Sequence, residues 1–157
     1  MESNAELREA TPEDQPGLDI VRRQAIEMGF SGTYERNDFA DLVAQPDPRL
    51  PEWIDDENTL VLVVTDELTP FAYGAYNMEE HRILGLYTGE TYRQEGHASR
   101  ILQSFEEHAR SNNASAIRVN SPRNAVGFFT KLGYQKKETT RSPRCDIILQ
   151  SMVKRLD

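Results

Sequence analysis

The chain has 157 residues, enough for one domain with a sizeable core, and 38% of them are hydrophobic, which argues against a disordered chain. With 26 Asp and Glu against 18 Lys and Arg, the net charge is −8, and this acidic balance disfavours general binding to the phosphates of DNA or RNA. The longest apolar run, residues 60–64, is far shorter than the about 20 residues of a membrane-spanning helix, and the N-terminus lacks a signal-peptide pattern, so we expect a cytoplasmic protein without membrane contact.

The first third of the chain shows mainly helical patterns. Residues 7–10 form a short edge-like segment, and Thr11, followed by proline and two carboxylates, is typical of a helix N-terminus. We expect this helix to end at Gly29 and a second helix to cover residues 34–44. Residues 45–57 contain three prolines and several acids, which predicts a long loop.

The remainder of the chain is dominated by strand patterns. β-Branched and alternating apolar residues predict strands over residues 60–64, 71–75 and 83–88. One amphipathic helix face then follows, made by Ala98, Ile101, Leu102, Phe105 and Ala109. After it we expect a strand at Ile117 and Val119, a short helix over residues 125–132 and a last β region over residues 134–155, broken near residues 142–143.

The order of these elements predicts the fold class. It is a strand, two helices, three strands, a helix, a strand, a helix and two strands. This order is typical of a mixed α/β (α+β) fold with a largely antiparallel first half and one β-α-β crossover in the second. We therefore expect one domain over residues 1–157, with a mixed sheet of six to seven strands and about four helices.

The segment of residues 86–102 carries the clearest functional pattern, because a strand runs through a short loop into a helix N-terminus. Gly96 and Ala98 are small where the chain turns, so the backbone N–H groups of residues 93–99 are able to converge on one point. Such a nest suits a pyrophosphate, and Arg93 adds a positive charge. The alternative is a structural turn that needs a glycine. Neither the dinucleotide fingerprint nor the Walker lysine motif is present.

The same segment resembles a known superfamily. Arg93-x-x-Gly96-x-Ala98 is similar to the Arg/Gln-x-x-Gly-x-Gly/Ala signature of GNAT acetyltransferases, and the preceding Leu-Tyr-Thr of residues 86–88 resembles the Leu-Tyr-Val of many members. Residues 125–134 resemble the later Ala-x-x-Phe-Tyr-x-Lys-x-Gly-Phe motif, and the element order agrees along nearly the whole chain. The resemblance implies an N-acetyltransferase that moves an acetyl group from acetyl-CoA to a primary amine of a small molecule or protein by direct attack in a ternary complex.

The resemblance also implies where acetyl-CoA binds. The strand of residues 86–88 should splay from the strand of Ile117 and Val119, with coenzyme A between them. The main chain of residues 86–88 would pair with the pantetheine arm, and a freed N–H there would polarise the thioester carbonyl. The amides of residues 93–99 would take the pyrophosphate. His97 would add charge to a phosphate when protonated, or face solvent. The implied cofactor-binding residues are Leu86, Tyr87, Thr88, Arg93, Gln94, Glu95, Gly96, His97, Ala98, Ser99, Phe128 and Phe129.

The catalytic groups depart from the family pattern. Family members often use a Glu before the signature as the base, or a water chain, but here that position falls near Arg82. The neighbouring candidates are Glu79, Glu80 and His81, each of which also suits a solvated turn. Many members protonate the leaving thiolate with a Tyr, and Phe129 stands at that position.

A different phenol could supply the proton that Phe129 lacks. Tyr87, Tyr92 or Tyr134 are the candidates, of which Tyr134 fits a core position better. Alternatively, the thiolate leaves without a side-chain acid, since a thiol with a pKa near 8.5 is a tolerable leaving group.

The acceptor side is expected between the first helices and the early strands. Tyr34, Phe39 and Trp53 lie there beside many carboxylates, which would suit a cationic amine. The alternative is that the aromatic residues pack under a loop and the acids belong to an acidic surface. The sequence does not choose among a free amino acid, a polyamine, an aminoglycoside-like compound and a protein terminus.

Other features of the sequence limit the possible functions but do not identify one. Three scattered histidines and the single Cys145 give no readable metal site and no internal disulfide. The excess of Arg over Lys fits either a salt-loving source or a GC-rich genome. The apolar C-terminal residues Ile147, Ile148, Leu149 and Met152 fit either a homodimer interface or a core. Two other functions stay open: an acetyl-CoA-binding regulatory module without turnover, and a small α/β protein with a purely structural Gly96 turn.

Overall fold

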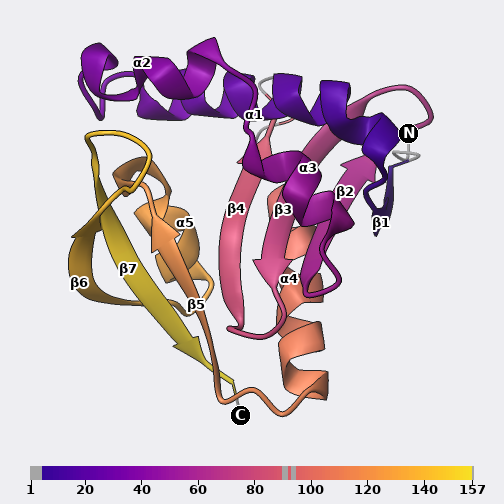
Figure 1. Ribbon diagram of the computed structural model, residues 1–157. Helices are drawn as coiled ribbons and strands as arrows, with labels where there is room; N and C mark the ends of the chain where they lie inside the picture. The colour runs from indigo at the N-terminus through magenta and orange to yellow at the C-terminus, as the bar shows by residue number, and fades with distance from the viewer. Residues whose placement is uncertain (1–4, 90–91, 93–94, 157) are drawn as a thin grey trace.

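A seven-stranded sheet with the strand order β1-β2-β3-β4-β5-β7-β6 organises the chain in the computed structural model, which describes residues 5–89, 92 and 95–156 (Figure 1). Neighbouring strands are antiparallel except β4 and β5, which are parallel. This mixed sheet confirms the expected fold class and strand number. The strands are β1 (Glu6–Glu9), β2 (Thr59–Thr65), β3 (Pro70–Asn77), β4 (Arg82–Thr88), β5 (Ala116–Ser121), β6 (Gln135–Arg141) and β7 (Ile148–Arg155).

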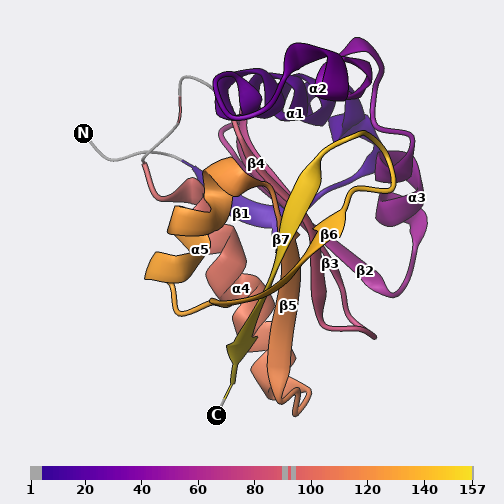
Figure 2. The same cartoon turned by 90° about the vertical axis from the view of Figure 1, so that its left-hand side faces the viewer.

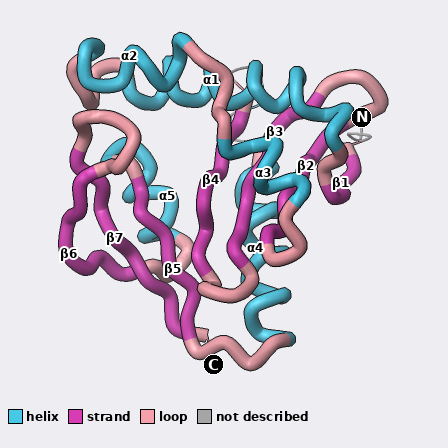
Figure 3. The backbone as a smooth tube through the Cα atoms, viewed as in Figure 1, coloured by secondary structure: helices cyan, strands magenta, loops and turns pink. Residues whose placement is uncertain are grey.

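Five α-helices flank this sheet within the described residues, one more than expected. Figure 2 shows α4 and α5 on one side of the sheet and α3 on the other. In Figures 1 and 3, α1 and α2 lie across the end of the molecule at which β4 and β5 diverge. The helices are α1 (Gln15–Phe30), α2 (Arg36–Ala44), α3 (Arg49–Asp55), α4 (His97–Ser111) and α5 (Val126–Lys131). No described helix is long and apolar enough to span a membrane.

The apolar run of β2 is explained by burial on both faces of the sheet. Leu62 and Val64 belong to the core beneath α4, whereas Val61 and Val63 belong to the core beneath α1 and α3. A strand covered on both faces has no solvent side, so its sequence shows a continuous apolar run instead of an alternation.

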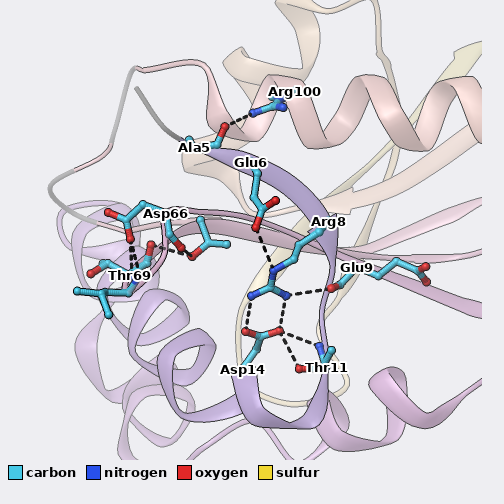
Figure 4. Close-up of polar contacts among 11 residues, drawn as sticks. Ala5, Glu6, Arg8, Glu9, Thr11, Asp14, Asp66, Thr69 and Arg100 are labelled. Carbon is cyan, nitrogen blue, oxygen red and sulfur yellow. Dashed lines mark hydrogen bonds and ion pairs between the residues drawn. The ribbon is translucent and has the colours of Figure 1, made fainter. Parts of the chain in front are cut away.

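The start of the first helix is held by a local network centred on Asp14 (Figure 4). The carboxylate of Asp14 accepts from the backbone N–H of Thr11 at 2.7 Å and from Nη1 and Nη2 of Arg8 at 2.8 and 2.9 Å. This network fits the helix start expected at Thr11 and ties β1 to the short 3₁₀ turn Pro12–Asp14 that precedes α1. Figure 4 also shows Arg100 of α4 donating to the carbonyl oxygen of Ala5.

Two expected boundaries were wrong. The loop predicted over residues 45–57 contains helix α3, in which Pro51 occupies the first turn, where its missing N–H has no helical partner to lose. Helix α1 continues past Gly29 to Phe30. A Cβ atom at Gly29 would lie 2.5 Å from Nδ2 of Asn124, so this glycine permits close packing between two segments and does not cap the helix.

Two irregularities of β4 shape the middle of the sheet. The register with β3 shifts so that Leu84 is an extra residue, between the pairs Ala75–Gly85 and Tyr76–Ile83. In the described part of the chain, β4 pairs with β5 at only two positions, Arg82–Arg118 and Ile83–Val119. Beyond Ile83 the two strands separate, which is the splay that the sequence resemblance implied.

Candidate active site

A first cavity of about 330 Å³ lies where β4 and β5 separate. Its lining is mostly apolar. It comes mainly from α1, residues 82–87 of β4, the segment around the start of α5 and the turn between β6 and β7, with single residues or pairs from α2, α3, β5 and β7. The charged residues of this lining are all arginines: Arg22, Arg49, Arg82 and Arg144. The cavity is therefore an apolar pocket with a few convergent cationic groups, the usual composition of a small-molecule site.

A second cavity of about 210 Å³ adjoins the first, because Leu86, Asn124 and Phe129 line both. It lies between β4 and the N-terminal part of α4, with Thr88 and Ala98 in its wall. Phe128 closes another side. The open edge of β4 thus passes two adjoining cavities that share α1 as a wall, one on the side of α3 and the β6–β7 turn and one beside the start of α4.

The structure brings together five of the residues expected to bind the cofactor. Leu86, Thr88, Ala98, Phe128 and Phe129 all line the second cavity. They come from β4, α4 and α5, which are separate in the sequence and meet because β4 and β5 diverge. The five side chains thus share one cavity, and their binding of coenzyme A stays a prediction.

The loop before α4 is described only in part. Gly96 adopts a left-handed backbone conformation with φ +85° at the N-cap of α4, which explains why a glycine stands there. Glu95 is exposed and Ser99 is half-buried in the first turns of the helix. Arg93 and Gln94 lie outside the described residues.

His97 does not face solvent, which corrects one of its two expected placements. It is buried, with its ring centroid 5.1 Å from that of Phe71 and 6.4 Å from that of Tyr92. Its Nε2 atom lies 3.1 Å from Oε1 of Glu95. The imidazole therefore packs between aromatic rings and the loop before α4.

Three of the four candidate catalytic residues lie away from both cavities. The N–H groups of Glu79 and Glu80 each donate to Oδ1 of Asn77 at 2.9 Å, so both residues belong to the exposed turn between β3 and β4. His81 follows in the same turn, with Nδ1 2.8 Å from the hydroxyl of Tyr76. The structure does not bring these three side chains to the site.

Tyr87, the fourth candidate, lines the first cavity. Its ring centroid is 5.2 Å from that of Tyr73, and a Cβ atom at Gly85 would lie 3.1 Å from its hydroxyl oxygen. The hydroxyl therefore lies over Gly85, in the part of β4 that has left β5. The absence of a side chain at Gly85 makes room for it.

The aromatic residues expected to bind the acceptor pack against other parts of the chain. Phe39 is buried against Phe30, with ring centroids 5.4 Å apart. The Tyr34 hydroxyl donates to the carbonyl oxygen of Ile148 at 2.9 Å and accepts from the N–H of Arg123 at 2.8 Å. Trp53 packs beneath the guanidinium of Arg49 at 4.6 Å. None of the three lines either cavity within the described part of the chain.

A buried carboxylate holds three of the cavity arginines together. The side chain of Asp47 has no exposed area, and its oxygens lie 2.8 Å from Nη2 of Arg49, 2.8 Å from Nη1 of Arg144 and 3.3 Å from Nε of Arg22. Arg49 also donates to Asp47 through its Nε and its backbone N–H, each at 3.0 Å. Asp47 therefore joins α1, α3 and the β6–β7 turn at one wall of the first cavity.

These contacts change the protonation of the groups involved. Burial alone would raise the pKa of Asp47, but the hydrogen bonds and charges of Arg49 and Arg22 outweigh it and lower that pKa to about 2. Burial would lower the pKa of Arg49, but Asp47 and the adjacent Tyr87 raise it above its ordinary value. Nearby Asp19, whose Oδ1 is buried without a hydrogen-bond partner, has a pKa raised by burial. Asp47 and Arg49 are consequently charged at neutral pH.

The family assignment follows from the sequence as a whole. The model of the family described as acetyltransferase (GNAT) domain matches residues 24–156. The protein belongs to the GNAT acetyltransferase family. No curated protein sequence matches the chain significantly.

Solved GNAT structures share this fold over nearly the whole chain. A GCN5-related N-acetyltransferase of Rhodopseudomonas palustris matches with a TM-score of 0.80 and 23% identity, over 98% of this chain and 97% of that one. The PaiA N-acetyltransferase of Thermoplasma acidophilum, in complex with coenzyme A, matches with a TM-score of 0.81 and 19% identity, over 97% and 99%. The ribosomal-protein-alanine N-acetyltransferase of Brucella melitensis has a TM-score of 0.69 and 20% identity, over 96% and 99%.

Three arginines of the first cavity, and the buried Asp47 behind them, were not expected from the sequence. Arg22, Arg49 and Arg144 come from α1, α3 and the β6–β7 turn, and Asp47 lies just before α3. Two weak signals were present: Asp47 stands between two prolines, and Arg144 follows a third. Neither signal indicates that these residues meet, because that depends on how the helices cross the open end of the sheet.

Proposed function

We propose that this GNAT protein transfers an acetyl group from acetyl-CoA to a primary amine held in the first cavity. The observation that carries the proposal is the open edge of β4, which passes between two adjoining cavities. One substrate is able to reach that edge from the start of α4 and the other from the side of α3 and the β6–β7 turn. A direct transfer in a ternary complex needs this two-sided access.

Acetyl-CoA fits the second cavity and the loop before α4. The backbone groups of β4 beyond Ile83 have no partner on β5 and are available to the amide groups of a pantetheine arm. The left-handed Gly96 leads into the N-terminus of α4, where unpaired N–H groups and the helix dipole favour a pyrophosphate. The solved structure of the PaiA relative contains coenzyme A, which supports the same ligand here.

The reaction is an acyl substitution. The neutral amine nitrogen attacks the acetyl carbonyl carbon, a C–N bond forms, the C–S bond breaks, and the thiolate of coenzyme A leaves. A backbone N–H near Leu86 or Tyr87 would stabilise the charge that develops on the carbonyl oxygen. Among the described residues, no Asp, Glu or His lines either cavity, so we infer that water removes the proton of the amine.

Tyr87 is our candidate for the group that protonates the thiolate. Phe129, at the family position for this acid, is buried and carries no hydroxyl. The hydroxyl of Tyr87 lies over Gly85 on the open part of β4 and faces the first cavity. Tyr87→Phe should therefore lower kcat and leave acetyl-CoA affinity unchanged.

Binding of acetyl-CoA is tested by calorimetry and thermal unfolding. At about 100 times its Kd the ligand should add roughly 2.7 kcal/mol of stability. Gly96→Glu places an anion beside the expected pyrophosphate site and should abolish binding. Gly32→Glu is a matched control, since Gly32 has a similar φ of +83° and, like Gly96, has no atom within 4 Å of a Cβ position. Equal binding by both variants would show that the loop before α4 is not the site.

A binding module without turnover is the second candidate. Two observations favour it. No carboxylate or imidazole occurs among the described lining residues, and Phe129, at the family position of the acid, has no hydroxyl to donate a proton. Release of free coenzyme A thiol with a panel of amines separates the two functions. Acetyl-CoA binding without thiol release from any amine would support the module.

A further inference from the structure

The charge of the first cavity is opposite to that of the protein. The chain carries 26 acidic and 18 basic residues, yet the four charged residues that line this cavity are all arginines. Asp47 lies behind three of them and is fully buried. Two further carboxylates lie near these arginines: Asp19, and Glu80, whose Oε1 lies 3.9 Å from Nε of Arg82. Even with both counted as ionised, four guanidinium groups face three carboxylates, so the cavity keeps an excess of positive charge.

Two of the arginines beside Asp47 line the cavity with side chains that are only partly buried. Arg49 and Arg144 keep 34% and 24% of their side-chain surface exposed, whereas Arg22 keeps 3%. Arg82 also keeps 34%, but its Nε lies 3.9 Å from the carboxylate of Glu80. Arg144 contacts Asp47 only through Nη1 in the described hydrogen bonds and ion pairs, which leaves most of its five N–H donors for another group. The apolar residues around them lower the local dielectric and strengthen any charge interaction.

Ion pairing with Asp47 alone does not account for this arrangement. Arg49 by itself supplies three hydrogen bonds to Asp47, from its backbone N–H, Nε and Nη2. Gathering further cations around one buried carboxylate costs desolvation that is seldom recovered as stability. A fixed set of guanidinium groups does, however, match the planar, bidentate geometry of an oxyanion.

We propose that the acceptor of the transferred acetyl group is a small amine that also carries an oxyanion, a carboxylate or a phosphate, held by Arg49 and Arg144. This inference rests on the proposed acetyl transfer. Asp47 acts as the positioning residue that holds both guanidinium groups. Tyr87 lies beside Arg49 and over Gly85, so the oxyanion binds close to the open edge of β4. The amine and the oxyanion are consequently separated by a few bonds, as in a compact amino acid or an aminoalkyl phosphate.

The proposal opposes the expectation of a cationic acceptor. Most of the carboxylates that suggested one, namely Glu35, Asp41, Asp55, Asp56 and Glu57, are exposed, and none lines either cavity within the described residues. A polyamine entering the first cavity would meet arginines and no lining carboxylate. Like charges at such a site reject the ligand.

The test compares amines with and without an oxyanion. We would measure kcat/KM for L-aspartate, L-glutamate, 4-aminobutanoate and 2-aminoethyl phosphate, for the first three with every carboxylate converted to a carboxamide, for 2-aminoethanol and for spermidine. The best anionic amine should exceed its neutral counterpart at least about tenfold, because charge-assisted hydrogen bonds are lost with the anion. Comparing the carboxylates with the phosphate identifies which oxyanion the site takes.

Matched variants test whether the preference for anionic amines arises in the first cavity. Arg144→Gln should remove most of the anionic preference, chiefly through KM, and Arg144→Lys should restore part of it. Arg141→Gln is the control, since Arg141 lies in the same hairpin, pairs with Asp146 and does not line the cavity. A preference for neutral or cationic amines, or an anionic preference that Arg144→Gln leaves intact, would overturn the proposal.

A binding measurement separates this proposal from the proposed acetyl transfer. Succinate and inorganic phosphate would be titrated by calorimetry into the protein saturated with coenzyme A. Weaker binding by Arg144→Gln than by Arg141→Gln supports the oxyanion site even if no amine is acetylated. If neither probe binds while acetyl-CoA does, the oxyanion site is refuted and the acetyl-CoA site stands.

Discussion

The hydroxyl of Tyr134 donates to Oε2 of Glu106 at 2.8 Å in a fully buried contact between the start of the last hairpin and the middle of α4. Nζ of Lys154 approaches the other oxygen of the same carboxylate at 3.1 Å. Burial and then the charge of Glu106 raise the pKa of Tyr134 well above its ordinary value. This phenol is therefore a structural donor and not an acid for the leaving thiolate.

Tyr134→Phe should destabilise the protein without affecting its site. The change leaves a buried carboxylate oxygen without a donor, which costs about 1–3 kcal/mol. Chemical denaturation measures the loss, and calorimetry should show unchanged acetyl-CoA affinity. Tyr92→Phe is a matched control, as no described hydrogen bond involves the Tyr92 hydroxyl. Normal stability of Tyr134→Phe would contradict this account.

Acid should weaken the protein through Asp47. Because the folded state holds the pKa of Asp47 at about 2, below its ordinary value of 3.8, this carboxylate stabilises the fold above pH 4. As the pH falls from 4 to 2, the unfolded chain binds a proton that the folded chain does not, and roughly 2 kcal/mol of stability is lost.

The Asp47→Asn variant isolates this effect. At pH 7 it should be less stable than the natural protein by about 3 kcal/mol, since three arginines lose their charged partner. Unfolding free energies measured from pH 7 to pH 2 should show that difference shrinking below pH 4. A difference that stays constant over this range would mean that Asp47 does not titrate as described.

Gly85→Ala should impair catalysis more than binding. A Cβ atom at this position would lie 2.8 Å from the ring of Tyr87, so the ring has to move away from the open edge of β4. We expect kcat to fall about tenfold, the size of one misplaced catalytic contact, with acetyl-CoA affinity nearly unchanged. Gly127→Ala, whose Cβ would meet no atom within 4 Å, serves as the control. An equal fall in kcat for Gly85→Ala and Gly127→Ala would show that the position of the Tyr87 ring does not matter for catalysis.

The hydrogen-bond network of Asp14 at the start of α1 should contribute to the stability of the fold and not to activity. Asp14→Ala removes both the cap of Thr11 and the partner of Arg8, and we expect a loss of about 1–2 kcal/mol. Arg8→Gln keeps the cap and removes only a partly exposed ion pair, so its loss should stay below about 1 kcal/mol. Thermal unfolding of the two variants gives this comparison. A larger loss of stability for Arg8→Gln than for Asp14→Ala would show that the ion pair, and not the cap, is the main contribution.

The features that the sequence by itself determined are local ones. The apolar spacing of Ile101, Leu102 and Phe105 predicted α4, and the doubly buried run of residues 60–64 predicted β2. Gly96 was expected at the turn before α4, and its left-handed φ of +85° is a conformation that glycine adopts without strain. Each of these depends on neighbours a few positions away, whose spacing is visible in the chain itself.

Only the tertiary structure decided the character of the first cavity. Arg144 and Asp47 are 97 positions apart, and no periodicity links them. Helix α3 likewise lies within a predicted loop, because burial of Leu50 against the sheet outweighs the prolines around it. Of the aromatic residues expected to bind the acceptor, Phe39 is buried and Tyr34 and Trp53 are half-buried, and the described lining of the first cavity contains arginines instead. The crossing of α1 over the diverging strands determines which of these side chains meet. Such contacts arise from packing between distant segments, which local sequence patterns do not encode.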